Sequence, residues 1–161
     1  MSTGLNLEKV PMDEMDGRIL RTIQKHPELA VAELAERVGL SHTPCWRRLK
    51  RLQASGVIER NAVILNPKRL GLEAVVFASI RLKQHDEETL DAFETAIRNL
   101  PQIVECFSMS GDSDYQLRIV VANIEAYHDF LKKIVLHLPG VASVNSHFAL
   151  NTVKLTTDLP I

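Results

Sequence analysis

Five basic side chains lie within one short stretch of this sequence and could bind phosphate. Residues 41–60 contain five basic residues against the single acid Glu59: Arg47, Arg48, Lys50, Arg51 and Arg60. The whole chain has a formal net charge of −1, but residues 71–161 hold 12 acidic and 7 basic residues, so the positive charge is local. Cations gathered on one element displace counterions from nucleic-acid phosphates. A solvated helix face is the alternative that charge alone leaves open.

The residues around these cations predict a helix over 42–55. Ser41 is a typical N-cap, Pro44 falls in the first turn where a missing N–H costs nothing, and Gly56 ends the helix. Cys45, Leu49 and Leu52 share one face, so we expect that face to pack inward. The outward side chains are then His42, Thr43, Trp46, Arg47 and Lys50.

Two earlier helices are expected to support this one. The first covers residues 13–25, with Asp13 as N-cap and Asp16 three residues later as a weaker form of the capping box. The second covers residues 31–38 and ends at Gly39. Short helices joined by a tight turn, with the bases on the later one, form a helix-turn-helix.

A helix-turn-helix places the start of its last helix in the major groove of DNA. We expect Arg47 to bond guanine, and Arg48, Lys50 and Arg51 to contact phosphate, which positions the protein without specifying the sequence. Trp46 packs either on the sugar-phosphate backbone or over the edge of the core. The candidate DNA contacts are Ser41, His42, Thr43, Trp46, Arg47, Arg48, Lys50 and Arg51.

The second half of the chain has the order β-α-β-β-α-β of a ferredoxin-like domain. Strands are expected at 74–83, 103–109 and 115–121, one or two further strands at 141–155, and helices at 87–99 and 124–137. The two helices cover one face of such a sheet and leave the other open. An open face in a small domain usually pairs with another subunit.

The turn Gly111-Asp112-Ser113-Asp114 joins two of these strands. Its two carboxylates could bind a cation or serve acid–base chemistry, but a segment rich in Gly, Asp and Ser is most often only a turn. Gly111 permits close approach of a ligand, and Asp112 and Asp114 offer acceptors to an amino group.

Several motifs together resemble the Lrp/AsnC family of leucine- and asparagine-responsive regulators. They include Glu33-Leu34-Ala35, Val38-Gly39-Leu40-Ser41, Arg48-Leu49-Lys50-Arg51-Leu52, Gly56-Val57-Ile58, Gly111-Asp112-Ser113-Asp114-Tyr115 and Pro139-Gly140-Val141. The resemblance implies an α+β fold, with an N-terminal winged helix-turn-helix domain and a C-terminal ferredoxin-like βαββαβ domain for effector binding and oligomerisation. It implies a homo-oligomer, a dimer that assembles to a tetramer or octamer, with amino-acid effectors bound between dimers.

The family resemblance also implies that the 111–114 loop lines the effector pocket, which makes Gly111, Asp112, Ser113 and Asp114 the candidate effector-binding residues. Two positions depart from the family pattern. Val31 stands where the family has a capping Ser or Thr, and Ser113 stands where it has Tyr.

We therefore expect a DNA-binding domain at 1–66, a linker at 67–73 and an effector-binding and oligomerisation domain at 74–161. No nucleophile–base constellation, metal spacing or phosphate loop is evident, so no enzyme, metal or cofactor is expected. The start of the chain has no basic, apolar signal pattern and no run is long enough to span a membrane, which favours the cytoplasm. Cys45 and Cys106 are expected to be core residues, with redox sensing by Cys45 as the alternative.

We predict that the protein is a transcriptional regulator that binds specific sequences of double-stranded DNA. Its assembly and DNA binding are expected to respond to a small effector, an amino acid. The alternative is an architectural protein that wraps DNA without an effector.

Overall fold

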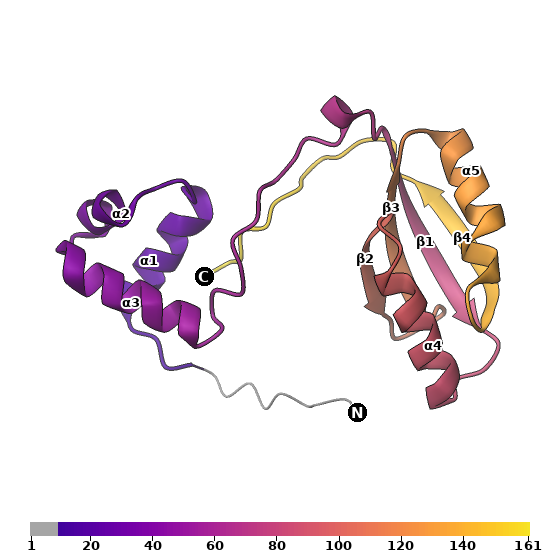
Figure 1. Cartoon of the computed structure of the whole chain (residues 1–161), viewed down its shortest axis with the longest axis horizontal. Helices are drawn as coiled ribbons and strands as arrows, with labels where there is room; N and C mark the ends of the chain where they lie inside the picture. Colours follow the sequence, from indigo (N-terminus) through magenta and orange to yellow (C-terminus); the bar gives the residue numbers. More distant parts are fainter. Residues whose placement is uncertain (1–9) are drawn as a thin grey trace. The chain divides into compact units, whose positions relative to one another are not determined.

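The computed structural model describes residues 10–161, and within them the chain forms two compact units (Figure 1). One unit combines the segment up to Ile64 with Lys154–Ile161, and the other consists of Leu65–Val153. The expectation of no signal peptide concerned residues 1–10, which lie outside the described residues except for Val10. Within the described part, no helix is long and apolar enough to cross a membrane.

Three helices build the first unit: α1 (Glu14–Lys25), α2 (Val31–Val38) and α3 (His42–Ala54). Their apolar faces meet in one core of Ile19, Leu20, Leu34, Ala35, Val38, Cys45 and Leu52. The observed bounds confirm the three predicted helices to within one residue at each end.

The ends of these helices follow from their local sequence. Asp13 caps α1 by accepting from the Asp16 N–H at 2.8 Å, and Asp16 in turn accepts from the Asp13 N–H at 3.1 Å. The predicted capping box is therefore confirmed. Helix α2 has Ala30 at its N-cap, so Val31, which the sequence analysis placed at the capping position, is instead the first residue of the helix. The Glu33 carboxylate accepts from the Ala30 N–H at 2.9 Å. This bond satisfies the N–H of an N-cap residue whose side chain has no oxygen with which to cap the helix.

Gly39 ends α2 in the left-handed conformation, with φ of +77°. A side chain is strained in that conformation, so glycine suits the turn between α2 and α3. After α3 the chain is extended, and residues 59–66 form no strand. The segment that follows α3, where a winged helix-turn-helix has its wing, therefore contains no paired strands.

A four-stranded antiparallel sheet with two helices forms the second unit. A short 3-10 turn, η1 (Lys68–Leu70), precedes it, and another, η2 (Val135–His137), follows the last helix. The main elements are β1 (Ala74–Leu82), α4 (Glu87–Arg98), β2 (Ile103–Ser108), β3 (Tyr115–Val121), α5 (Ile124–Lys133) and β4 (Val141–Phe148). The order confirms the predicted βαββαβ pattern.

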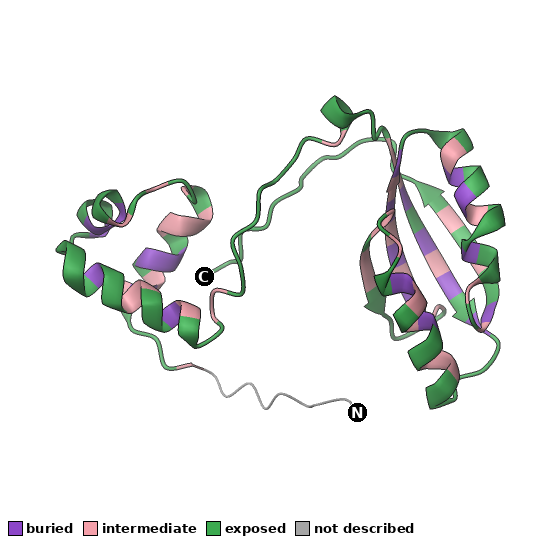
Figure 2. Cartoon of the chain, viewed as in Figure 1, coloured by how far each residue is buried: buried purple, intermediate pink, exposed green. Residues whose placement is uncertain are grey.

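The strands lie in the order β2-β3-β1-β4, with every neighbouring pair antiparallel. Alternate residues of β1, such as Val76, Ala78 and Ile80, are fully buried in a core that includes Phe93 of α4 and Tyr127 of α5. Because one face of the sheet meets both helices, they lie on the same side of it (Figures 1 and 2).

The other face of the sheet is open within this unit. Phe77 of β1 points to that face and is 40% exposed, opposite Arg118 of β3 in the register. Contiguous apolar patches on a protein surface mark interaction sites.

The end of the chain differs in part from the sequence prediction. One or two strands were predicted over 141–155, and the structure has β4, which ends at Phe148. The final residues, Lys154–Ile161, pack with the first unit. Gln24 of α1 holds this segment, because its side-chain amide accepts from the Leu159 N–H at 2.7 Å and donates to the Leu159 carbonyl at 3.3 Å. A contact between positions 135 residues apart leaves no periodic trace in the sequence.

Candidate DNA interface and effector loop

Helix α3 turns one face into its unit, as its apolar spacing predicted. Cys45 and Leu52 are completely buried, and Leu49 packs against the same core. Burial of these three side chains fixes the rotation of α3 about its axis, so the opposite residues must face outward.

The outward face holds His42, Thr43, Trp46, Arg47 and Lys50, all exposed. Within residues 10–161, neither Arg47 nor Lys50 takes part in a salt bridge, so both cations can meet a partner. Trp46 is 45% exposed, so only part of the indole is covered by its unit. Ser41 lies at the N-cap of α3, but its hydroxyl makes no capping hydrogen bond.

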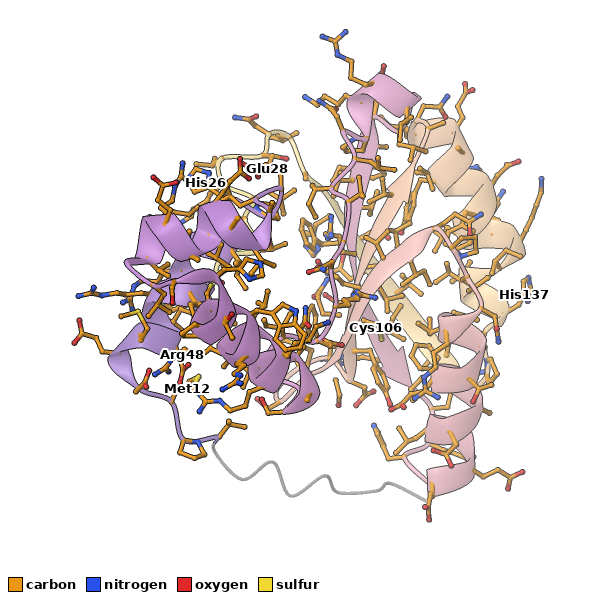
Figure 3. All side chains as sticks on the ribbon, turned by 60° about the vertical axis from the view of Figure 1, so that its left-hand side comes forward. Met12, His26, Glu28, Arg48, Cys106 and His137 are labelled. Atoms are coloured by element: carbon orange, nitrogen blue, oxygen red, sulfur yellow. The ribbon has the colours of Figure 1, made fainter. Side chains whose placement is uncertain are left out.

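The other two predicted cations of α3 are already paired. Arg48 donates from one nitrogen, Nη1, to Asp16 Oδ1 at 2.8 Å and to Asp13 Oδ2 at 2.6 Å. Arg51 donates from Nη2 to Asp16 Oδ2. Figure 3 shows Arg48 beside the chain segment that contains Met12 and leads into α1. Sequence periodicity did not predict these bonds, since the partners lie 32 or 35 positions apart.

The contact between Arg48 and Asp13 changes the acidity of both of these groups. The pKa of the Asp13 carboxyl is lowered, first by the hydrogen bond from the Asp16 N–H and then by Arg48. The pKa of Arg48 is raised by its hydrogen bonds to Asp13 and Asp16. Both groups therefore remain charged at neutral pH, and the ion pair persists there.

The two cysteines are poorly suited to redox sensing. Burial raises the pKa of the Cys45 thiol, and burial is also the main cause that raises the pKa of Cys106. A thiol with a raised pKa holds less of the reactive thiolate at neutral pH. Cys45 in the core of the first unit agrees with the packing role expected from the sequence.

The 111–114 turn connects β2 and β3 and lies against the end of β1. Gly111 has φ of +122°, a conformation that disfavours any side chain. The backbone carbonyl of Asp112 accepts a hydrogen bond from Arg81 Nε, which ties the turn to β1. The Asp112 carboxylate and the Ser113 hydroxyl make no hydrogen bond or ion pair with the residues that the structure describes.

Asp114, in contrast, is engaged on both carboxylate oxygens. Oδ2 accepts from the Leu82 N–H at 2.7 Å, and Oδ1 lies 2.8 Å from His85 Nε2. These bonds lower the pKa of Asp114, with the Leu82 N–H as the largest cause and His85 as a further one. Arg81 and His85 escaped the sequence analysis because neither belongs to a motif, and only the end of β1 brings them to the turn.

Within residues 10–161, no group of three or more His, Cys, Asp or Glu side chains could hold a metal ion. The Asp112–Asp114 pair is therefore not part of a larger acidic cluster in the described chain. The polar groups of this turn are suited to hydrogen bonding with a small polar molecule.

Comparison with known proteins assigns each part of the chain to a domain family. The model of the winged helix-turn-helix DNA-binding family matches residues 12–59. The model of the Lrp/AsnC ligand binding domain matches residues 75–159, more than half of the chain. These ranges include every residue proposed above from α3 and from the 111–114 turn.

Whole proteins match over nearly their full length. The DNA-binding transcriptional activator DecR of Escherichia coli (strain K12) is 36% identical over 150 residues, which cover 93% of this chain and 99% of DecR. The crystal structure of an AsnC family transcriptional regulator from Agrobacterium tumefaciens is 44% identical, with a TM-score of 0.88 over 92% of this chain and 97% of that one.

A second solved structure contains an amino acid. It is the L-Met complex of a transcriptional regulator from Neisseria meningitidis, 32% identical, with a TM-score of 0.90 over 93% of this chain and 97% of that one. The resemblance expected from the sequence motifs is confirmed by domain models, relatives and structures alike. This chain belongs to the Lrp/AsnC family of DNA-binding transcriptional regulators.

Proposed function

We propose that this regulator binds a specific DNA sequence through the outward face of α3. The supporting observation is that Arg47 and Lys50 are exposed and without ion pairs in the described chain, on the face opposite the buried Cys45 and Leu52. Arg47 bonds a guanine edge in the major groove, and Lys50 neutralises a phosphate. His42, Thr43, Trp46 and the free hydroxyl of Ser41 complete the contact surface at the start of the helix.

We further propose that an amino acid regulates the protein through the 111–114 turn of the second unit. The L-Met complex of the Neisseria relative supports an amino acid as the class of ligand. Asp114 is already bonded to Leu82 and His85, whereas the Asp112 carboxylate has no partner in the described chain. Asp112 is therefore the better acceptor for an effector ammonium group, and Asp114 holds the turn in place.

Assembly into a homo-oligomer is the third part of the proposal. The open sheet face with Phe77 gives the second unit an apolar surface that a second copy would cover. A dimer places two α3 helices on successive turns of DNA, and dimers then assemble into a tetramer or octamer in the cytoplasm. An effector that binds one assembly more tightly than another shifts the balance between them.

Two measurements test this function. Selection from a random-sequence DNA library should yield a duplex that the protein binds far more tightly than its scrambled version. Thermal shift with the twenty amino acids, one at a time, should reveal at least one that stabilises the protein, because a ligand that binds only the native state raises its stability. Failure of the selection would refute sequence-specific DNA binding. Tight binding with no response to any amino acid would favour the architectural DNA-wrapping alternative.

A further inference from the structure

Asp16 is the one charged side chain that is fully buried in the described part of the chain. It lies in α1, and its carboxylate accepts hydrogen bonds from Arg48 and Arg51 of α3. Arg48 donates to Oδ1 at 2.8 Å and Arg51 donates to Oδ2, while the Asp13 N–H also donates to Oδ2 at 3.1 Å. A buried carboxylate is tolerated only when its oxygens are well satisfied, and here both are.

The two arginines attach α3 to α1 at two points. Arg48 and Arg51 are three residues apart, so they lie on the same side of α3 in successive turns. Ile19 of α1 and Cys45 of α3 belong to one apolar core, which resists separation of the helices but has little directional preference. Charged hydrogen bonds to one carboxylate are directional, so they resist sliding and rotation of α3 on its support.

Asp13 extends this attachment to the start of α1. Its carboxylate accepts from Arg48 at 2.6 Å and from the Asp16 N–H at 2.8 Å, so the cap of α1 and the side of α3 share one set of bonds. Contacts to base edges require side chains held within a fraction of an ångström, and a rigid support supplies that precision.

We propose that Asp16 is a positioning residue for DNA recognition, which holds Arg48 and Arg51 so that α3 presents its outward face at a fixed angle. Arg48 and Arg51 then contribute to specific binding through Asp16 and not through phosphate contacts. This inference deepens the proposed function, because it presumes that α3 binds DNA. Neighbouring arginines then have different roles, because Arg47 binds DNA and Arg48 bonds to Asp16 within the protein.

Removal of the Asp16 charge gives a test in which two explanations predict opposite signs. If Asp16 acts only as a negative charge near DNA, Asp16→Asn should tighten binding to every duplex. If Asp16 positions α3, the same change should weaken binding to the selected duplex and spare binding to its scrambled version. Glu14→Gln is the matched control, because Glu14 is an exposed acid of the same helix and, among the described residues, pairs with Arg18 alone.

The experiment measures the affinity of the full chain for the selected and the scrambled duplex, well below the melting temperature of each variant. We expect Asp16→Asn to lower the ratio of the two affinities by about tenfold or more, whereas Glu14→Gln leaves the ratio unchanged. An unchanged ratio for a folded Asp16→Asn protein would overturn the proposal and leave Asp16 with a role in stability alone.

Arg48→Ala provides a second route that does not depend on the folding of Asp16→Asn. A lost phosphate contact lowers the slope of log affinity against log salt by about 0.9, whereas a lost positioning bond leaves the slope unchanged and lowers the affinity ratio. We expect the second result for Arg48→Ala. A slope lower by about 0.9 would overturn the proposal and return Arg48 to the phosphate contacts. If the wild-type protein selects no duplex at all, the proposed function fails, and that outcome is distinct from both of these.

Discussion

Helix α3 and the 111–114 turn are the two regions where polar side chains were expected to bind a partner, and they differ in how those side chains are held. On α3, Arg47 and Lys50 are exposed and have no ion pair in the described chain, and the engaged cations Arg48 and Arg51 point to α1. In the turn, Asp114 is tied to the end of β1, whereas the Asp112 carboxylate has no partner in the described chain. In each region, neighbouring residues of one chemical type are held differently.

The difference between the regions lies in what positions the side chains. A helix has a fixed period, so the burial of Cys45 and Leu52 determines which residues point outward. A turn has no such period, and its side chains follow whichever local donors they meet. Sequence therefore distinguishes the two faces of α3 but does not distinguish Asp112 from Asp114.

The largest predicted effect on DNA binding comes from Arg47 and Lys50, the exposed cations of α3. Arg47→Ala should cost about 1–3 kcal/mol of binding free energy on the selected duplex and much less on the scrambled one, because a guanine contact is lost. Lys50→Ala should weaken binding to both duplexes and lower the salt slope by about 0.9. Filter binding across a salt series measures both effects.

Both variants should melt as the wild type does, since neither side chain is buried or paired within the described chain. Equal losses on both duplexes for Arg47→Ala would remove Arg47 from base recognition and break the distinction drawn for this face.

A second comparison concerns the two carboxylates of the turn. With an effector that stabilises the wild type at a hundred times its dissociation constant, about 2.7 kcal/mol of stability comes from binding. We expect Asp112→Asn to lose most of this stabilisation, because the acceptor for the ammonium group is weakened. Asp114→Asn should keep more of the stabilisation but melt at a lower temperature without effector. Loss of the response in Asp114→Asn alone would reverse the roles given to the two residues.

Elements with a regular period could be predicted from the sequence, whereas contacts between distant residues could not. Helices α1 to α3 and the strands of the sheet were predictable because apolar residues repeat with a helical or strand period, and because Asp13, Gly39 and Gly56 mark helix ends. The Asp16–Arg48 pair, the His85–Asp114 pair and the Gln24–Leu159 contact were not predictable. Each joins residues 29 to 135 positions apart, and a period along the chain contains no information on such contacts.

A third, smaller effect is the loss of stability at acid pH as Asp114 in the turn is protonated. The pKa of Asp114 lies below its ordinary value of 3.8 in the folded protein, because the carboxylate accepts from the Leu82 N–H and from His85. Such a group stabilises the fold above its unfolded pKa, and that contribution is lost as pH falls through the folded pKa.

The melting temperature of wild type should therefore exceed that of Asp114→Asn at neutral pH, and the gap should narrow below about pH 4. Melting curves recorded from neutral to acid pH for both proteins measure this gap. A gap that stays constant through the acid range would show that the charge of Asp114 does not stabilise the turn.

The smallest expected effect concerns Ser41, whose hydroxyl makes no capping bond to α3. Ser41→Ala should leave the melting temperature almost unchanged, whereas a working N-cap typically contributes about 1 kcal/mol. DNA binding should weaken by about 0.5–1.5 kcal/mol if the free hydroxyl bonds a phosphate. A large fall in melting temperature would mean that Ser41 caps α3 in solution, and its hydroxyl would then be engaged as Asp114 is.

DNA recognition by α3 and amino-acid binding at the 111–114 turn should be coupled within one regulator. This coupling is measured as the affinity for the selected duplex when each of the twenty amino acids is added, together with the affinity for the effective amino acid with and without that duplex. We expect at least one amino acid to change DNA affinity by about 5- to 150-fold, and DNA to change the affinity for this amino acid by the same factor. DNA affinity that stays constant across all twenty amino acids would show that the two sites are not coupled.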